Sequence, residues 1–440
     1  MKAADALIGW LRPGPGLAGT TVVGWRIEVV QGDGVRAGIR DSLVGGPYEG
    51  PGMAARLAGS LELHWSDGLV TRAGLDRQAV VEPAVELEAW RSDAVGERSG
   101  RLPPLAGPAT LPEVNTFDAT VAEAGVERAE LCLRTLQQLH TGSGAGGVGR
   151  VDAVMRVSRG ERTVATSRGF RADWRETSCS IDLWADEIAG AAYARRCLPT
   201  DADLDRLARE VSTLATSLRS TDELPALARG VLFLPHVVQE LIGRFVVSNL
   251  SGRSIRDGRS PFSLTDLEMG RRAIREDLDL TIDTTLPFEL ASAPCSPEGV
   301  PAGRVSLIAA GRLLSPTLDL ATAAELNRPP TPTPRGRPGA VLSSTLPEIG
   351  LNEALDLLGD GVVIRDLPGL HTQPVRRAAY ALVAPEGQAV VGGAAKGRCA
   401  VRLAGRMLDH LTQPSTRLVR IPGELQAGLL VLSGVELLPA

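Results

Sequence analysis

The side chains that most often do chemistry in proteins are few in this chain and lie far apart. None of its five histidines has another histidine or a cysteine at the spacing of a metal site. The motifs HExxH, Walker A and GxSxG are also absent. We expect His140 at the C-terminal end of a helix, where the helix dipole favours it, and His410 on a helix surface. The histidines are His64, His140, His236, His371 and His410.

The five cysteines predict neither a disulfide framework nor a zinc ribbon, because their number is odd and no two form a CxxC pair. Reduced thiols in a cytosolic chain are the simpler interpretation. Cys132 falls on an apolar helical stripe, which favours a small core residue over a reactive thiol. The cysteines are Cys132, Cys179, Cys197, Cys295 and Cys399.

Residues Gly142 to Gly147 match GxGxxG, the phosphate-binding pattern of dinucleotide-binding folds. That site needs a strand before the glycines and a helix after them, so that the helix N-terminus meets the phosphates. Here the predicted order is the reverse, a helix followed by a strand. We therefore interpret the segment as a flexible connector.

Composition and charge predict a globular cytoplasmic protein that binds neither nucleic acid nor a membrane. The net charge is −5, lysine occurs only at Lys2 and Lys396, and aromatic residues make up 3%. There is no basic stripe and little to stack on bases, which argues against nucleic acid. No run of 18 residues is predominantly apolar, and the N-terminus resembles a signal peptide poorly because Asp5 interrupts its apolar stretch.

Helices and strands follow one another irregularly, which predicts an α+β fold with mainly antiparallel sheets. β-branched runs separated by turn residues predict strands over 20–75 and 150–186, with a proline-rich loop at 97–115 between them. Apolar residues at three- and four-residue spacing predict helices at 118–140 and 201–218.

A chain of 440 residues exceeds the usual size of one core, so two domains are expected. An exposed connection at 219–230 marks the predicted boundary, which gives an N-terminal α+β domain at 1–225 and a β-rich C-terminal domain at 226–440. The C-terminal domain is expected to begin with a strand at 230–234 and a helix from about Pro235. Further elements of this domain are a proline-rich extended loop at 327–339, a short helix at 351–358 and strands to the C-terminus.

Several segments of the second half resemble, in order and spacing, the motifs of the TldD/PmbA family. The GDFS portion of the third motif is replaced here by Arg376 to Ala379. The resemblance is clear over 230–440 and weaker over 20–225. The segments are 251–260 (SGRSIRDGRS), similar to SGRAVQEGRS; 296–314, similar to DDEGVP…vLIenGvL; and 367–375 (LPGLHTQPV), similar to GLHxxxNPVTGDFS.

The resemblance implies that active members hold zinc with an HExxxH helix and a downstream cysteine, the glutamate serving as base. The matching segment here is QELIGR: Glu240 matches the glutamate, while Gln239 and Arg244 stand where the histidines would be. A glutamine carbonyl is a weak zinc ligand, and a guanidinium is a fixed cation that cannot coordinate a metal. Residues 415–418, before the last strands, contain no cysteine. We therefore expect a TldE/PmbA-like chain with no catalytic or metal-ligating residue.

The same resemblance implies a non-catalytic subunit that pairs with a zinc-bearing TldD-like subunit to process unfolded or precursor peptides, with zinc only in the partner. An extended peptide could be held by strand addition, which tolerates many sequences. The loops at 327–339 and 370–378 are the expected rims of the cavity. The residues expected to contact substrate or partner are His371, Thr372, Gln373, Arg328 and Arg417.

Two alternatives remain open from the residues. An ion pair between Arg244 and Glu240, four residues apart on one helix face, would give Arg244 a structural role in place of a substrate contact. The chain could also be a stand-alone zinc-independent hydrolase or a peptide-binding protein that uses the same cavity. Its chemistry would then depend on Cys295, Cys399, Ser260 or Glu240, although no base is evident beside any of them.

Overall fold

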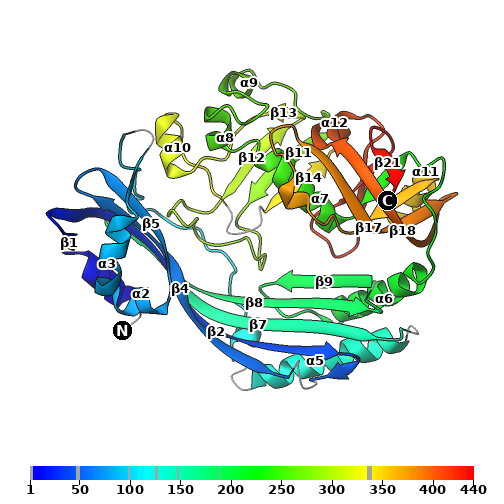
Figure 1. Cartoon of the computed structure of the whole chain (residues 1–440), viewed down its shortest axis with the longest axis horizontal. Coiled ribbons are helices and arrows are strands. Elements are labelled where there is room, and N and C mark those ends of the chain that lie inside the picture. Colours follow the sequence, from blue (N-terminus) through cyan, green and yellow to red (C-terminus); the bar gives the residue numbers. More distant parts are fainter. Residues whose placement is uncertain are drawn as a thin grey trace.

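The computed structural model of the chain describes residues 3–45, 50–97, 100–123, 127–145, 148–187, 189–333 and 339–440. Within these ranges the first half forms one long, curved antiparallel sheet and the second half forms two further sheets above it (Figure 1). The mixture of helices and mainly antiparallel strands confirms the predicted α+β class.

The long sheet has nine strands, in the order β6-β5-β4-β2-β7-β8-β9, with β1 and β3 paired to β2. Its longest strands run through most of the two predicted strand regions. A glycine is needed at position 59, because a Cβ atom there would collide with the carbonyl oxygen of Glu28 on the neighbouring strand. The strands are β1 (Gly16–Leu17), β2 (Thr20–Arg40), β3 (Leu43–Val44), β4 (Gly52–Trp65), β5 (Leu69–Leu75), β6 (Val95–Gly96), β7 (Val151–Thr166), β8 (Arg171–Ala185) and β9 (Ala189–Arg195).

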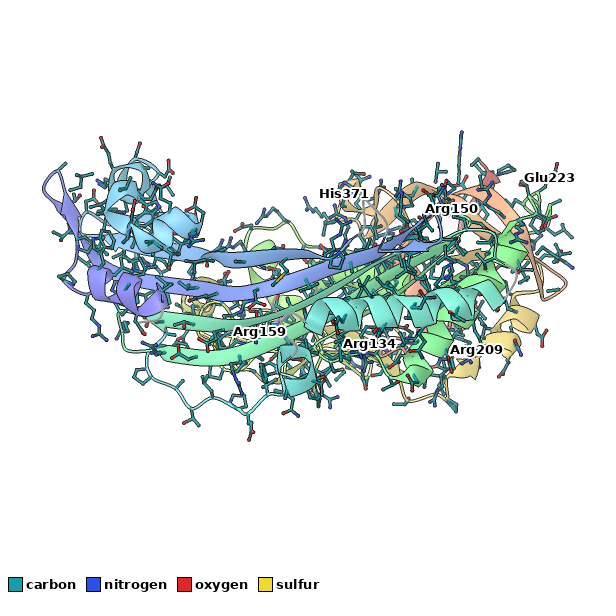
Figure 2. All side chains as sticks on the ribbon, turned by 90° about the horizontal axis from the view of Figure 1, so that it is seen from below. Arg134, Arg150, Arg159, Arg209, Glu223 and His371 are labelled. Atoms are coloured by element: carbon teal, nitrogen blue, oxygen red, sulfur yellow. The ribbon has the colours of Figure 1, made fainter. Side chains whose placement is uncertain are left out.

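Side chains alternate across this sheet, so its two faces have different partners. Trp25 and Ile27 of β2 are buried among helices, whereas Arg26 between them forms an ion pair at 3.2 Å with Glu298 of the second half. The face covered by helices is apolar and the face toward the second half carries charged pairs. Figure 2, which views the molecule from below, shows α5 along the strands of this sheet, with Arg134 on that helix.

Among its described residues, the first half has six helices. They are α1 (Ala3–Leu11), α2 (Arg77–Val81), α3 (Pro83–Ser92), α4 (Ala119–Glu123), α5 (Glu127–Ala145) and α6 (Asp201–Leu218). Helix α6 has the predicted bounds and begins with a capping box between Thr200 and Asp203. The described residues of the helix predicted at 118–140 are helical over 119–123 and from 127 onward, in α4 and α5, and residues 124–126 lie outside the described residues. Cys132 is fully buried, which confirms that it is a core residue.

The flexible connector expected at 142–147 is wrong for residues 142–145, which belong to α5; Gly146 and Gly147 lie outside the described residues. Helices α5 and α6 pack against each other, and a Cβ atom at Gly142 would lie 3.1 Å from the Cβ atom of Ala208. A glycine there therefore serves close helix packing.

The second half contains an eight-stranded sheet, in the order β15-β19-β20-β10-β16-β17-β18-β21, and a four-stranded sheet, in the order β13-β12-β11-β14. None of the three sheets combines strands from both sides of the predicted boundary at 225/226. The boundary itself stays a prediction. The strands are β10 (Gly230–Phe233), β11 (Leu278–Asp283), β12 (Arg304–Ala309), β13 (Arg312–Leu313), β14 (Ala340–Ser344), β15 (Ile349–Gly350), β16 (Gly361–Ile364), β17 (Ala379–Val391), β18 (Ala394–Arg406), β19 (Arg417–Arg420), β20 (Gly428–Val431) and β21 (Glu436–Pro439).

The helices of the second half are mostly short, and one large core of about forty buried side chains joins most of them to both sheets. The helices are α7 (Pro235–Ile242), η1 (Gly243–Val247), α8 (Gly252–Arg256), α9 (Leu264–Glu268), α10 (Leu320–Glu325), α11 (Leu351–Leu358), η2 (Leu370–Thr372) and α12 (Met407–Thr412). The short helix predicted at 351–358 is α11. Residues 334–338 of the predicted proline-rich loop lie outside the described residues.

The expectation that His410 lies on a helix surface is wrong. The side chain is fully buried, and its Nε2 lies 2.8 Å from the hydroxyl oxygen of Tyr380. A Cβ atom at Gly405 would lie 2.5 Å from that same nitrogen, so a glycine opposite the ring makes room for it. The polar neighbour Asp409 suggested exposure, but α12 turns the next residue into the core.

Candidate functional site

The helix that carries residues 239–244, the segment that resembles the metal motif, begins directly after β10. Pro235 opens α7 at a position where its missing N–H is not needed, and Val237, Val238, Leu241 and Ile242 are buried. Gln239 and Glu240 fall on the other side of the helix and are partly exposed. Packing of one apolar stripe therefore fixes which way the motif faces.

The helix changes its winding where the motif ends. Residues Gly243–Val247 form a single π-helical turn, in which the amide of Ser248 donates to the carbonyl oxygen of Gly243 at 3.1 Å. Such turns are rare in proteins, and those that occur often lie at functional sites. Gly243, Arg244 and Val247 of this turn all line a cavity.

The cavity has a volume of about 630 Å³ and lies between the α7–η1 segment and the loop at 367–371. These two segments meet because β10 pairs in parallel with β16, so that the segments following the two strands leave the sheet at the same edge. Gly369, with φ of +80°, makes the turn before η2 in a conformation that favours glycine. The lining residues are Gln239, Glu240, Gly243, Arg244, Val247, Ser248, Leu367, Pro368, Gly369, Leu370 and His371.

Two hydrogen bonds fasten the 370–378 loop to this helical segment. The Nη2 of Arg244 donates to the carbonyl oxygen of Gln373 at 2.5 Å, and the Nδ2 of Asn249 donates to the carbonyl oxygen of Val375 at 2.8 Å. Asn249 is fully buried and also donates to the carbonyl oxygen of Phe245 at 2.8 Å. The loop that closes one side of the cavity is therefore held by side chains from η1 and the turn after it.

The Arg244 guanidinium is only partly satisfied. Its Nε is buried without a hydrogen-bond partner, and its bond to Gln373 uses one of five N–H donors. The ion pair expected with Glu240 is not among the contacts of the described residues. Glu240 instead lies 3.3 Å from the Nε2 of His236, one turn earlier on α7. The carboxylate thus has a different partner from the one that the helical spacing suggested.

The residues on the cavity wall do not fit a zinc ion. Gln239 and Arg244 occupy the two helical positions of the motif, and the latter is a cation with no lone pair to donate. Over the part of the chain that the structure describes, no three His, Cys, Asp or Glu side chains gather closely enough to hold a metal.

The other candidates divide between this cavity and the surface. His371 lines the cavity, Thr372 donates to the carbonyl oxygen of Gly369 at 2.8 Å, and the Oε1 of Gln373 accepts from the amide of Ala381 at 3.0 Å. In Figure 2, His371 lies at the upper margin of the view, away from Arg134 on α5 and Arg209 on α6.

The two remaining arginines are elsewhere. Arg328 lines a second cavity of about 470 Å³ with Arg304 and Pro329 to Pro332, and lies 3.4 Å from Glu268. Arg417 donates to the carbonyl oxygens of Pro414 and Thr416 at the start of β19. Neither lines the cavity beside α7.

Three of the four candidates of the alternative hypothesis, Cys295, Cys399 and Ser260, also lie outside that cavity. Burial raises the pKa of the Cys295 thiol to about 12 and that of Cys399 to about 11, which disfavours the reactive thiolate. The Oγ of Ser260 donates to the carbonyl oxygen of Asn249 at 2.7 Å and accepts from the amide of Phe262 at 3.0 Å. Of the four candidates, only Glu240 lines the cavity.

Sequence reasoning missed His236, Asn249 and the π-helical turn. His236 precedes Glu240 by four residues, a spacing that could have indicated the contact. No sequence signal distinguishes the π-helical turn from ordinary helix.

Comparisons with known proteins agree with this architecture. Residues 229–436 match the model of the PmbA/TldA metallopeptidase C-terminal domain. No curated protein sequence matches the chain. The family model and the fold together define a metallopeptidase-related α+β protein. Over residues 229–436, just under half of its length, the chain belongs to the PmbA/TldA family.

Solved structures extend the likeness of fold to the whole chain. TldE from Thermococcus kodakarensis superimposes with a TM-score of 0.80 at 15% identity, covering 99% of this chain and 100% of the other. A candidate modulator of DNA gyrase from Thermotoga maritima gives 0.75 at 16% identity, covering 99% of each chain. A second candidate modulator, from Bacteroides thetaiotaomicron, gives 0.73 at 15% identity, covering 100% of this chain and 98% of the other.

Proposed function

We propose that this chain is the non-catalytic, TldE-like subunit of a cytoplasmic peptide-processing pair whose zinc is held by a TldD-like partner. Its substrates are unfolded or precursor peptides. The observation that carries the proposal is Arg244: a fixed cation lines the cavity at a position of the metal motif and is fastened to Gln373 of the opposite loop.

Three further features support the proposal. The cavity, at about 630 Å³, is within the usual size range of ligand sites, so the site keeps room for a ligand although its metal motif is degenerate. The likeness of fold to TldE extends over the whole chain. Among the described residues no helix is both long and apolar enough to cross a bilayer, and such a helix is not needed by a cytoplasmic pair.

A stand-alone hydrolase has less support. Cys295, Cys399 and Ser260 are buried away from the cavity, and the pKa values of both thiols are raised by burial. Glu240 lines the cavity beside His236 and could act as a base, but the one hydroxyl among the lining residues, that of Ser248, donates to the carbonyl oxygen of Gly243.

The test is reconstitution of peptide cleavage. The chain, the zinc-bearing TldD-like protein from the same organism and their mixture are each incubated with casein and with a labelled unfolded peptide. We expect no cleavage by the chain alone, and cleavage by the mixture that a chelator abolishes. A partner variant that lacks the glutamate of its HExxxH motif is the matched control. Chelator-resistant proteolysis by the highly purified chain would overturn the proposal.

A further inference from the structure

Arg244 places one unneutralised cation in an otherwise largely apolar cavity. Its hydrogen bond to Gln373 is to a neutral carbonyl oxygen, so it leaves the charge in place. The one carboxylate on the same wall, Glu240, lies beside His236 instead. Most other lining groups are aliphatic side chains or glycines, among them Val247, Leu367 and Leu370.

Most of the guanidinium's hydrogen-bonding capacity is also unused. Within the described residues Arg244 makes one hydrogen bond, and its Nε is buried with no acceptor. A buried donor without an acceptor is uncommon and costs free energy, so it calls for a partner such as a ligand. Arginine presents its donors in a planar fork that matches the two oxygens of a carboxylate.

The charge balance favours a singly charged anion. One arginine can neutralise one negative charge, and Glu240 on the same wall would repel a second. A carboxylate has that charge, whereas a phosphate group would bring almost two.

We propose that the cavity beside α7 binds the carboxylate group of a peptide, through the guanidinium of Arg244. This proposal deepens the proposed function, and the identification of the ligand as a peptide rests on that function. The position that holds zinc in active relatives here anchors a substrate anion. The carboxylate is either the C-terminal one or that of an acidic side chain. The apolar walls accept the neighbouring aliphatic part of the peptide.

The experiment measures binding to the full isolated chain by isothermal titration. The probes are an N-acetylated tetrapeptide of leucine and alanine with a free C-terminus, its C-terminal amide, and the amide with one internal alanine replaced by aspartate. We expect the free acid to bind about 10- to 100-fold more tightly than the amide, the range given by hydrogen bonds to a charged group. If the aspartate-containing amide binds as tightly as the free acid, the site accepts any peptide carboxylate. If it binds no more tightly than the plain amide, the site is specific for the C-terminal carboxylate.

Variants separate this role from a purely structural one. Arg244→Gln should abolish the preference for the free acid, and Arg244→Lys, which keeps the charge but loses the planar fork of donors, should retain part of it. Glu240→Gln should strengthen binding of the free acid and leave that of the amide unchanged, because it removes a like charge from the wall. Arg420→Gln, at an exposed arginine 3.2 Å from Glu348, is the control and should change nothing.

The outcomes distinguish this inference from the proposed function. Equal affinity for free acid and amide, binding of neither at millimolar concentration, or an undiminished preference in Arg244→Gln would each overturn the carboxylate site, even if the pair with the TldD-like protein forms and cleaves peptides. A clear preference without any pairing would instead leave the site standing and overturn the subunit role.

Discussion

Acidification should destabilise the second half of the protein through one buried histidine. Burial lowers the pKa of His410 to about 4 from a usual value of 6.5, and the charge of Asp409 only partly opposes this. The ring is therefore neutral in the folded protein, while the unfolded chain takes up a proton as the pH falls below 6.5. A folded pKa that is depressed in this way gives stability that is complete above 6.5 and is lost as the pH falls to about 4.

The size of the effect follows from the shift. The pKa of His410 falls from 6.5 to about 4 on folding, and each pH unit of this interval changes the free energy of unfolding by about 1.36 kcal/mol. The loss of stability between pH 6.5 and 4 is therefore about 3 kcal/mol. The control is His410→Gln, whose amide does not titrate. We expect the free energy of unfolding of the wild-type protein, relative to this variant, to fall by about 3 kcal/mol from pH 7 to pH 4.

The assay is urea unfolding followed by circular dichroism at several pH values. All six tryptophans lie in the first half, the last being Trp184, so tryptophan fluorescence reports that half separately. Glu62 is common to both proteins and cancels: burial opposes its ionisation, but the hydrogen bond with His64 and the charges of Arg26 and Arg72 lower its pKa to about 2. Parallel pH curves for wild type and variant would refute the reasoning.

Two further predictions concern the cavity wall and its loop. The isolated chain should hold no stoichiometric zinc after mild desalting, because Gln239 and Arg244 replace both helical ligands; one tightly bound zinc per chain by elemental analysis would contradict this. Asn249→Ala should cost about 1–3 kcal/mol because it removes two buried hydrogen bonds, to the carbonyl oxygens of Phe245 and Val375, and it should speed proteolysis within 370–378. Unchanged cleavage in that loop would mean that Asn249 does not hold it.

Elements with local signals were predictable from the sequence. The apolar spacing of α6 predicted its bounds, and the apolar stripe of α7 predicted the buried face that orients the motif. Helix α5 was predicted too short because Gly142 was interpreted as the start of a flexible connector, whereas it packs closely against Ala208.

The assembly of the site depended on non-local pairing. Residues 239–244 and 367–371 line one cavity because β10 and β16 pair in parallel, and nothing within either strand specifies its partner. The resemblance to a known family named both segments, but the contacts of Arg244 and Glu240 came only with the structure. The burial of His410 was unpredictable for a similar reason, since Tyr380 and Gly405, which accommodate it, lie on other strands.

The central claim, that this chain works as one subunit of a pair, is tested most directly by the mass of the species that it forms. The chain, of 46.3 kDa, is mixed at micromolar concentration with the zinc-bearing TldD-like protein from the same organism and measured by light scattering after size exclusion. The account predicts a single species with the mass of one copy of each chain. Two proteins that elute separately, each with its own mass, would contradict it.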